Sequence, residues 1–281
     1  MSKVNRMSQM RGAFDLGSRV LGALPIVNRF LSRLQVESLL QCRLELPDPR
    51  RKISAPQTLM VLLRNLVVAR VPLYSVAEWA RFMMPEALGL SSDQLVVLND
   101  DRIGRALDEL FDCDRQALLT DFVIGVVREF RINLEELHND STSLSLQGQY
   151  RQAEGRRVRG KTTLRVTFGY NKDHRPDLKQ LLWILTVSND GAVPVHFKVT
   201  DGNIEDSSTH LETWNLLRQL VGSSQFLYVA DSKLCTRENL RYIDQEQGGF
   251  ITVLPQSRKE DALFREWLSR HDPQWQEIAR F

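Results

Sequence analysis

The chain has 281 residues, of which 42% are hydrophobic and 26% are charged, as in ordinary soluble globular proteins. This length accommodates about two domains. The net charge of +2 is too small to indicate a polyanionic partner, so any such argument depends on local charge. Three widely separated cysteines favour a reducing compartment. Without a signal-peptide pattern or an apolar run of membrane-spanning length, we expect a cytoplasmic protein with no membrane partner.

The first part of the chain, to about residue 131, has the apolar spacing of helices. Four segments repeat apolar side chains at helical intervals: 57–71, 75–84, 100–111 and 114–130. Asp100 and Asp114 stand where the N-caps of the last two helices are expected. We therefore predict an all-helical N-terminal domain over residues 1–131.

From residue 132 the pattern changes to strands with intervening helices. Strands are expected where β-branched and aromatic residues gather, at 134–148, 162–170, 181–189, 193–200, 225–231 and 249–255. The dipeptide Asp190-Gly191 predicts a hairpin between the third and fourth of these. A helix is expected over 207–222, with Thr209 and Glu212 as a candidate capping box, and another over 236–249.

This element order predicts an α/β (α+β) domain over residues 132–281 with a ribonuclease H-like mixed sheet. In that topology the middle of the first strand lies beside the end of the fourth strand. Asp140 and Asp231 fall at these two places. Asp is unusual inside a strand, and two adjacent carboxylates repel each other unless a cation lies between them. Hard oxygen ligands suit Mg²⁺ or Mn²⁺, so the pair is a candidate metal site for phosphoryl transfer.

Both aspartates also have ordinary structural explanations. Asp140 fits the solvent face of a strand or a bulge, and Asp231 fits the N-cap of the helix that starts near Thr236. Asp206 is explained in the same way, as a helix N-cap. The five histidines have no zinc-ligand spacing, and His210 is placed on a helix without a role.

A basic segment lies between the two aspartates in the sequence. Residues 151–179 contain nine Lys or Arg: Arg151, Arg156, Arg157, Arg159, Lys161, Arg165, Lys172, Arg175 and Lys179. Tyr150, Phe168 and Tyr170 are interleaved with them. Cations neutralise phosphates and aromatic rings stack on bases, so the segment is a candidate DNA contact, although a solvated charged loop explains it as well.

Several segments resemble DDE transposases of bacterial insertion sequences, in the cut-and-paste group with a Tyr-Arg-Glu-Lys signature. They are "NDDRIGRALDELF", "LHNDSTSLSLQGQY", "GYNKDHRPDLKQLLWILTVSNDGAVPVHFKVTDGNIEDSSTH" and "FLYVADSKLCTRENL", in family order. The resemblance implies cleavage and strand transfer at transposon ends, with Mg²⁺ or Mn²⁺ as cofactor. Asp140 matches the family's first catalytic aspartate and Asp231 the second. From the charge of the basic segment we expect Arg156, Arg157, Arg159, Lys161, Lys172 and Arg175 to contact DNA. The helical domain is expected to bind DNA ends or to dimerise.

The chain departs from this family at the third acid. No Arg stands three positions after any of the five tyrosines, so the Tyr-Arg-Glu-Lys motif is absent. We therefore expect an N-terminal fragment or truncated form, incomplete at the C-terminus and inactive as it stands. Glu260 and Glu266, on an amphipathic helix after the last strand, are topologically admissible substitutes.

Two interpretations follow. In the first, the chain is a transposase that acts on transposon ends and target DNA, as a homodimer or with the full-length enzyme. In the second, it is a non-catalytic DNA-binding fragment that binds element ends or pairs with and inhibits the full-length transposase.

Overall fold

The computed structural model describes residues 18–44, 50–151, 153–169 and 175–274. Its contacts divide the chain into two compact units, Met1–Phe122 and Val123–Phe281. The division falls inside α7 (Arg115–Phe130), whereas the sequence places the boundary at the end of this helix.

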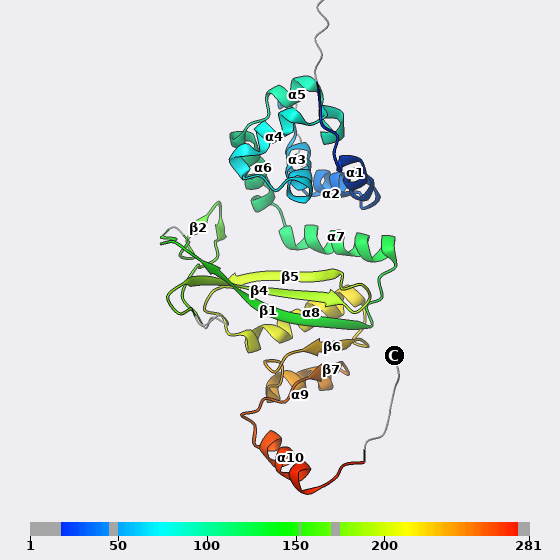
Figure 1. Ribbon diagram of the computed structural model, residues 1–281, viewed down its shortest axis with the longest axis vertical. Helices are drawn as coiled ribbons and strands as arrows, with labels where there is room; N and C mark the ends of the chain where they lie inside the picture. The colour runs from blue at the N-terminus through cyan, green and yellow to red at the C-terminus, as the bar shows by residue number, and fades with distance from the viewer. Residues whose placement is uncertain (1–17, 45–49, 152, 170–174, 275–281) are drawn as a thin grey trace, which may run out of the picture. The chain divides into compact units, whose positions relative to one another are not determined.

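Within the described residues of the first unit, 18–44 and 50–122, the regular structure is helical apart from one β-bridge between Val20 and Met83. Its helices are α1 (Leu24–Arg33), α2 (Val36–Arg43), α3 (Ala55–Val68), η1 (Leu73–Ser75), α4 (Val76–Phe82), η2 (Pro85–Leu88), α5 (Ser92–Val96) and α6 (Asp100–Asp112), followed by the first part of α7 (Figure 1). Its core gathers apolar side chains from several of these helices, among them Leu24, Val61, Val76 and Ile103. The expected helical character of this region is confirmed.

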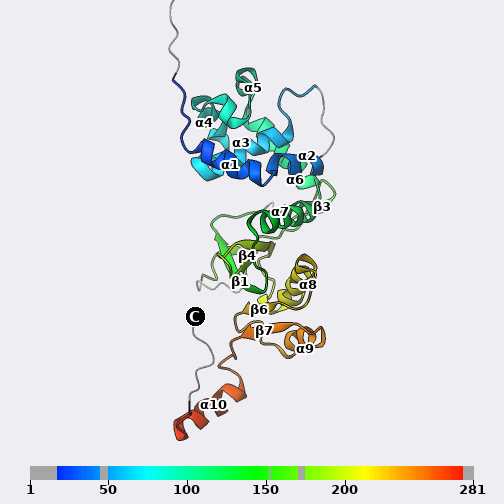
Figure 2. The ribbon, with the colours of Figure 1, turned by 90° about the vertical axis from the view of Figure 1, so that its right-hand side faces the viewer.

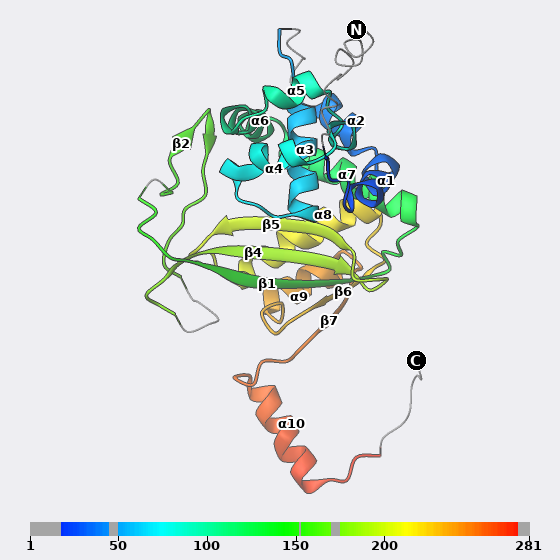
Figure 3. The ribbon, with the colours of Figure 1, turned by 45° about the horizontal axis from the view of Figure 1, so that its top comes forward.

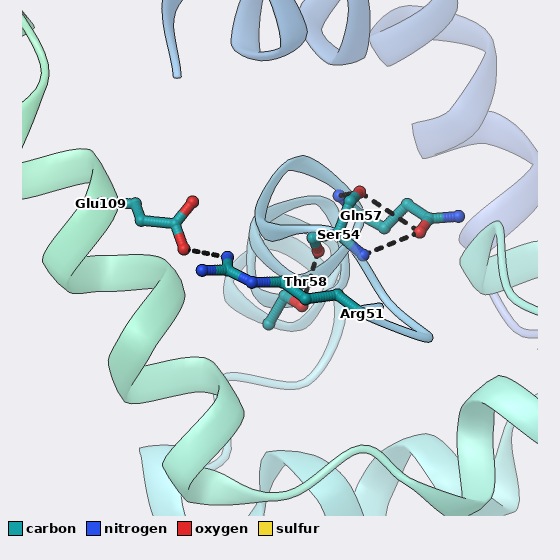
Figure 4. Close-up of polar contacts among 5 residues, drawn as sticks. All are labelled: Arg51, Ser54, Gln57, Thr58 and Glu109. Carbon is teal, nitrogen blue, oxygen red and sulfur yellow. Dashed lines mark hydrogen bonds and ion pairs between the residues drawn. The ribbon is translucent and has the colours of Figure 1, made fainter. Parts of the chain in front are cut away.

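Helix α3 begins with a capping box, which satisfies backbone groups that a helix start leaves unpaired. The Gln57 backbone N–H donates to Ser54 Oγ at 3.2 Å, and the Ser54 N–H donates to Gln57 Oε1 at 3.1 Å. Thr58 Oγ1 donates to the Ser54 carbonyl at 2.9 Å, and Arg51 forms an ion pair with Glu109 of α6 (Figure 4). These contacts fix the entry into the most buried helix of the unit.

The sequence predicts the N-cap of α7 correctly but not the N-cap of α6. Asn99, not Asp100, caps α6, because its Oδ1 accepts the backbone N–H of Arg102 at 2.9 Å. Asp114 fills the expected role in α7, since its Oδ1 accepts the N–H of Ala117 at 3.0 Å.

No single described helix is long and apolar enough to cross a membrane. The segments Ala55–Val68 and Leu73–Phe82 pass this test only when taken together, and they meet at an angle of 109°.

The second unit is built on a five-stranded mixed sheet. Its strands are β1 (Glu136–Leu146), β4 (Lys179–Ser188), β5 (Pro194–Asp201), β6 (Leu227–Ala230) and β7 (Gly249–Thr252), in the order β5-β4-β1-β6-β7 (Figure 3). The pairs β1–β4 and β4–β5 are antiparallel, whereas β1–β6 and β6–β7 are parallel. This is the ribonuclease H-like order that the sequence predicts, so the α+β fold class is confirmed.

Two helices, α8 (His210–Val221) and α9 (Arg237–Gln245), lie on the same side of the sheet (Figure 2). The core beneath them includes Leu137, Ile184 and Tyr228 from the strands and Trp214 from α8, all fully buried. On the opposite face Trp183 stacks on Phe197, which is partly exposed. Helix α10 (Lys259–Arg270) follows β7, as expected, and has no buried residue.

The expected strand over residues 162–170 is wrong. Only Lys161–Thr162 is a strand there, and the following described residues form single bridges, such as that between Thr167 and Gln180. The edge of β4 is occupied by β5 as far as Leu181, which leaves Lys179 and Gln180 at this edge, and Gln180 pairs with Thr167. The position of Tyr170 lies outside the described residues.

The predicted capping box of α8 is also wrong. Thr209 ends a 3-10 turn, η3 (Asp206–Thr209), and its hydroxyl donates to the Asp206 carbonyl at 2.7 Å instead of accepting from the helix. Glu212 pairs with Lys198 at 2.5 Å. The preceding turn already supplies partners for this helix start, so the side-chain box does not form.

Candidate metal and nucleic-acid site

The parallel pairing of β1 with β6 brings Asp140 and Asp231 side by side. The last registered pair is Asn139 with Ala230, and each aspartate is the next residue on its strand. Neighbouring strands lie about 4.8 Å apart. Asn139 and Ala230 are buried, whereas Asp140 and Asp231 are exposed, as the alternation of a strand requires. The two carboxylates therefore meet on one face of the sheet, where β6 ends.

Local hydrogen bonds orient both carboxylates. Asp140 Oδ1 accepts the N–H of Ser141 at 2.8 Å, and Asp231 Oδ1 accepts the N–H of Lys233 at 3.0 Å. The Asp231 carbonyl accepts the hydroxyl of Thr252 at 2.6 Å, which links the ends of β6 and β7.

Asp231 is not the cap of the following helix. Thr236 caps α9, because its Oγ1 accepts the N–H of Asn239 at 3.1 Å. The structural explanation that the sequence offers for Asp231 therefore does not apply, and its carboxylate remains at the sheet end beside Asp140.

The carboxylates of Asp140 and Asp231 supply some of the oxygen ligands that a hard divalent cation needs. Mg²⁺ is commonly held by one or two carboxylates and several waters. Two adjacent aspartates can provide the carboxylates. Among the described residues, no group of three or more His, Cys, Asp or Glu side chains could hold a metal ion. Asp140 and Asp231 are therefore adjacent in the sheet register, and no third acid from the described part of the chain joins them in a metal-binding group.

The two substitute acids do not join this pair. Glu260 is exposed at the start of α10, and Glu266 forms an ion pair with Arg270 at 2.5 Å. Both lie on a helix without buried residues. Surface charge on a solvated helix accounts for their positions.

Asp206 does not act as the expected N-cap. It opens the 3-10 turn η3, whose start has no side-chain cap, and its carbonyl accepts the Thr209 hydroxyl. Its carboxylate acts on His210 instead: burial lowers the pKa of His210, and the charges of Asp231, Asp206 and Asp140 oppose that shift. Three acidic groups therefore lie within electrostatic range of one buried imidazole.

A chain of buried polar side chains beneath the aspartates was missed by sequence reasoning. Thr186 Oγ1 donates to Asn139 Oδ1 at 2.9 Å, the Asn139 side chain hydrogen-bonds to the Tyr228 phenol, and Tyr228 Oη lies 3.1 Å from His210 Nδ1. Burial and the charge of Asp231 raise the pKa of Tyr228, so the phenol stays protonated. The only sequence signal was Asn139, a polar residue on the inward face of a strand.

The basic segment forms a separate hairpin of β2 (Arg157–Val158) and β3 (Lys161–Thr162). Arg159 and Gly160 make its two-residue turn, with φ of 48° and 77°, the left-handed geometry of a type I′ hairpin. Arg156, Arg157 and Arg159 are exposed, and Lys161 is half-buried. The hairpin therefore presents a cluster of cations to solvent.

The last two candidate DNA contacts, Lys172 and Arg175, do not belong to the β2–β3 hairpin. Lys172 lies outside the described residues. Arg175 is exposed, but its guanidinium makes two hydrogen bonds to Asp177, at 2.8 and 2.7 Å, which raise the pKa of Arg175 and lower that of Asp177. Part of its positive charge is therefore neutralised within the chain.

The comparisons with known proteins assign no function. Residues 17–124 match the family model described as "Domain of unknown function (DUF4277)", which covers less than half of the chain. No curated protein matches the sequence.

Among solved structures, similar chains come from transposases bound to DNA. A Mos1 transposase paired-end complex with left transposon end is 9% identical, with a TM-score of 0.27, over 81% of this chain and 74% of that chain. A piggyBac transposase synaptic complex with hairpin DNA is 10% identical, with a TM-score of 0.40, over 85% of this chain and 51% of that chain. A Mos1 mariner paired end complex with Mn is 9% identical, with a TM-score of 0.27, over 88% of this chain and 80% of that chain. Similarity at this level does not establish a shared function.

Proposed function

We propose that the chain is a transposase-type protein of a bacterial insertion sequence, which binds the element ends and holds a divalent cation for DNA cleavage and strand transfer. The observation that supports this proposal is the parallel register of β1 and β6, in which Asn139 pairs with Ala230 and each aspartate is the next residue along its chain segment. The resemblance of the surrounding segments to DDE transposases supports the same assignment.

In this proposal each part of the site has a distinct role. Asp140 and Asp231 hold Mg²⁺ or Mn²⁺, which when bound activates the attacking oxygen and stabilises the leaving oxygen of a phosphoryl transfer. The exposed cations of the β2–β3 hairpin neutralise backbone phosphates and keep the DNA in place. Target DNA and element ends are then contacted in a largely sequence-independent way by this hairpin.

We further propose that the chain is catalytically inactive by itself. Among the described residues, no third His, Cys, Asp or Glu side chain joins the two aspartates in a group that could hold a metal ion. A phosphoryl transfer that relies on two ions needs both to be fixed, and loose positioning of one reacting partner costs about 10²-fold in rate.

A second candidate function follows from the same observations. A chain with an exposed basic hairpin and an incomplete acidic site can bind element ends without cutting them, or pair with a full-length transposase and lower its activity. The partner is then the transposon DNA or the active enzyme.

The decisive experiment is a Mn²⁺ titration followed by electron paramagnetic resonance, on the 281-residue chain and on two single variants, Asp140→Asn and Asp231→Asn. We expect the chain to bind Mn²⁺ and each variant to lose binding, because one carboxylate alone leaves the ion mostly hydrated. Asp244→Asn, at an exposed position of α9, is the matched control and should bind as the unmodified chain does. Equal binding by all four proteins would refute the metal site.

A mixing experiment separates the two candidate functions. If the chain is a non-catalytic inhibitor, the double variant Asp140→Asn/Asp231→Asn should inhibit an active full-length transposase as strongly as the unmodified chain does. Inhibition of this kind needs only DNA or protein binding. Loss of inhibition in the double variant would favour a role for the bound ion.

A further inference from the structure

The face of the sheet opposite α8 and α9 carries an apolar surface beside Asp140. Strand pairing places Leu185 of β4 opposite Asp140 and Phe197 of β5 opposite Leu185, so the three side chains share one face. Trp183, two residues before Leu185, points to the same face and stacks on Phe197, with ring centroids 5.1 Å apart. Helices α8 and α9 lie on the other side, and Phe197 is 39% exposed (Figure 2). The open-face patch is defined by four apolar residues: Trp183, Leu185, Phe197 and Val199.

Helix α10 carries a second apolar surface that nothing buries within the described part of the chain. Leu263, Phe264 and Trp267 recur at helical spacing and are 54%, 55% and 45% exposed. The ring of Trp267 stacks between those of Phe264 and His271, with centroids 6.3 and 4.8 Å away. Single exposed apolar residues are ordinary, but three large ones on one side of a helix indicate an interaction surface. Leu263, Phe264 and Trp267 are the apolar stripe of α10.

The charges of α10 allow the apolar stripe to be buried. Asp261 pairs with Arg265 at 2.8 Å, and Glu266 pairs with Arg270 at 2.5 Å, both along the helix. These two pairs compensate four charges within α10 itself, so a surface that covers the stripe needs no opposite charge. The open-face patch has no charged member and fits this requirement.

The course of the chain before α10 favours the sheet of a second copy over the sheet of the same chain. Helix α10 follows β7, at one edge of the sheet, whereas the open-face patch lies on β4 and β5 at the other edge. Arg258, just before the helix, donates from Nη2 to the Cys235 carbonyl at 2.9 Å. From this anchor α10 runs away from its own sheet, and none of its residues is buried (Figures 1 and 3). The apolar stripe is therefore presented to another molecule.

We propose that two copies of the chain form a reciprocal dimer, in which the apolar stripe of α10 from each copy packs on the open-face patch of the other. Each contact buries three half-exposed side chains, about 100 Å² apiece, and a similar area of the sheet. Two such contacts bury about 1,200 Å², at the lower end of the range for specific complexes. The dimer should therefore exchange with monomers, and α10 of each copy borders Asp140 of the other. This inference is independent of the proposed metal site.

Sedimentation velocity of the 281-residue chain over a wide range of concentrations tests this dimer. We expect the unmodified chain to change from monomer to dimer as its concentration rises. Trp267→Glu and Phe197→Lys should each raise the dissociation constant by about 30-fold or more, because each places a charge at the centre of an apolar contact. Ser269→Glu adds the same charge at an exposed position on the other side of α10, and Val253→Glu replaces an exposed apolar residue after β7. Both controls should dimerise as the unmodified chain does.

A mixture of the two variants tests whether the contact is made between copies. In a heterodimer of Trp267→Glu with Phe197→Lys, one contact is unmodified and the other places the new carboxylate against the new ammonium. We expect this mixture to dimerise at concentrations at which either variant alone is monomeric. Fluorescence-detected sedimentation of labelled Trp267→Glu with unlabelled Phe197→Lys measures it, and circular dichroism shows that each variant is folded.

Three outcomes would overturn the proposal. A chain that is monomeric at every concentration would mean that α10 docks on its own sheet or that the open-face patch takes another ligand, such as unpaired bases. Dimers that persist in both variants would place the interface elsewhere. Variants that are monomeric alone and stay monomeric when mixed would show that α10 and the open-face patch do not contact each other across the dimer. The measurement on the unmodified chain decides the first outcome even if a variant does not fold.

Discussion

Buried imidazoles connect the stability of the second unit to pH. The His196 side chain lies within β5, and burial together with the charge of Lys198 lowers its pKa, an effect that Glu212 opposes. In the unfolded chain a histidine has a pKa of about 6.5. Below that value the unfolded state binds a proton that the folded state takes up only at lower pH.

The free energy of unfolding should therefore fall as the pH drops below about 6.5, by up to about 1.4 kcal/mol per pH unit for each such proton. Urea unfolding at pH 7.5, 6.5 and 5.5 measures this slope. His196→Gln should make it shallower, because the unfolded state loses one proton-binding group. His271→Gln, at an exposed position, is the control and should keep the slope of the unmodified chain. A slope that His196→Gln leaves unchanged would contradict the assignment.

At the scale of elements, helix starts provide a sharp comparison between neighbouring residues. Asn99→Ala should destabilise the first unit by about 1 kcal/mol, because the Arg102 N–H loses the acceptor that caps α6. Asp100→Ala removes a charge in the first turn, worth about 0.3–1 kcal/mol, together with an acceptor for the exposed Asp101 N–H at 3.1 Å. Thermal or urea unfolding followed by circular dichroism measures both changes. A larger loss for Asp100→Ala would show that the sequence-based cap was right.

The β2–β3 hairpin should contribute salt-sensitive affinity for DNA. Replacing Arg156, Arg157 and Arg159 with Ala removes three exposed cations, and the log–log dependence of affinity on salt should flatten by about 0.9 for each phosphate that the variant no longer neutralises. Fluorescence anisotropy with labelled duplex DNA between low and moderate salt measures the slope.

A charge-matched control accompanies the hairpin variant. Lys259, Arg265 and Arg270 are three exposed cations of α10, of which the two arginines are paired with Asp261 and Glu266. Their replacement with Ala changes the net charge equally. If both triple variants show the same slope, the hairpin is an ordinary solvated segment and DNA affinity comes from overall charge.

Strands and helices with a strong local pattern could be predicted, and elements that depend on tertiary neighbours could not. The hairpin at Asp190-Gly191 is specified by neighbouring residues in the sequence. The structure contains this turn, with φ of 73° at Gly191. The strand expected over residues 162–170 failed because β5 occupies most of the edge of β4, which no local pattern reveals. The capping box at Thr209 failed because a 3-10 turn precedes the helix.

At the scale of the whole molecule, element order carried more information than any single motif. Three antiparallel strands followed by two parallel ones predicted that Asp140 and Asp231 meet, although they are far apart in the sequence. The buried chain from Thr186 to His210 could not be predicted in this way. Its members come from β4, β1, β6 and α8, and each residue taken alone is ordinary for its element.

The completeness of the acidic site decides whether the chain can act on DNA. Asp140 and Asp231 stand together, and no third acid among the described residues joins them. We predict no detectable cleavage or joining of a cognate transposon end by the 281-residue chain with Mg²⁺ or Mn²⁺, because one of two ions lacks a fixed ligand and the in-line geometry is lost. Gel analysis of end-labelled DNA measures both reactions. Adding a segment that supplies a third carboxylate should restore cleavage, and Asp140→Asn in that extended protein should abolish it again. If the 281-residue chain cleaves, Glu260→Gln and Glu266→Gln become the informative variants: loss of activity in either would mean that α10 docks on the open sheet face and completes the site.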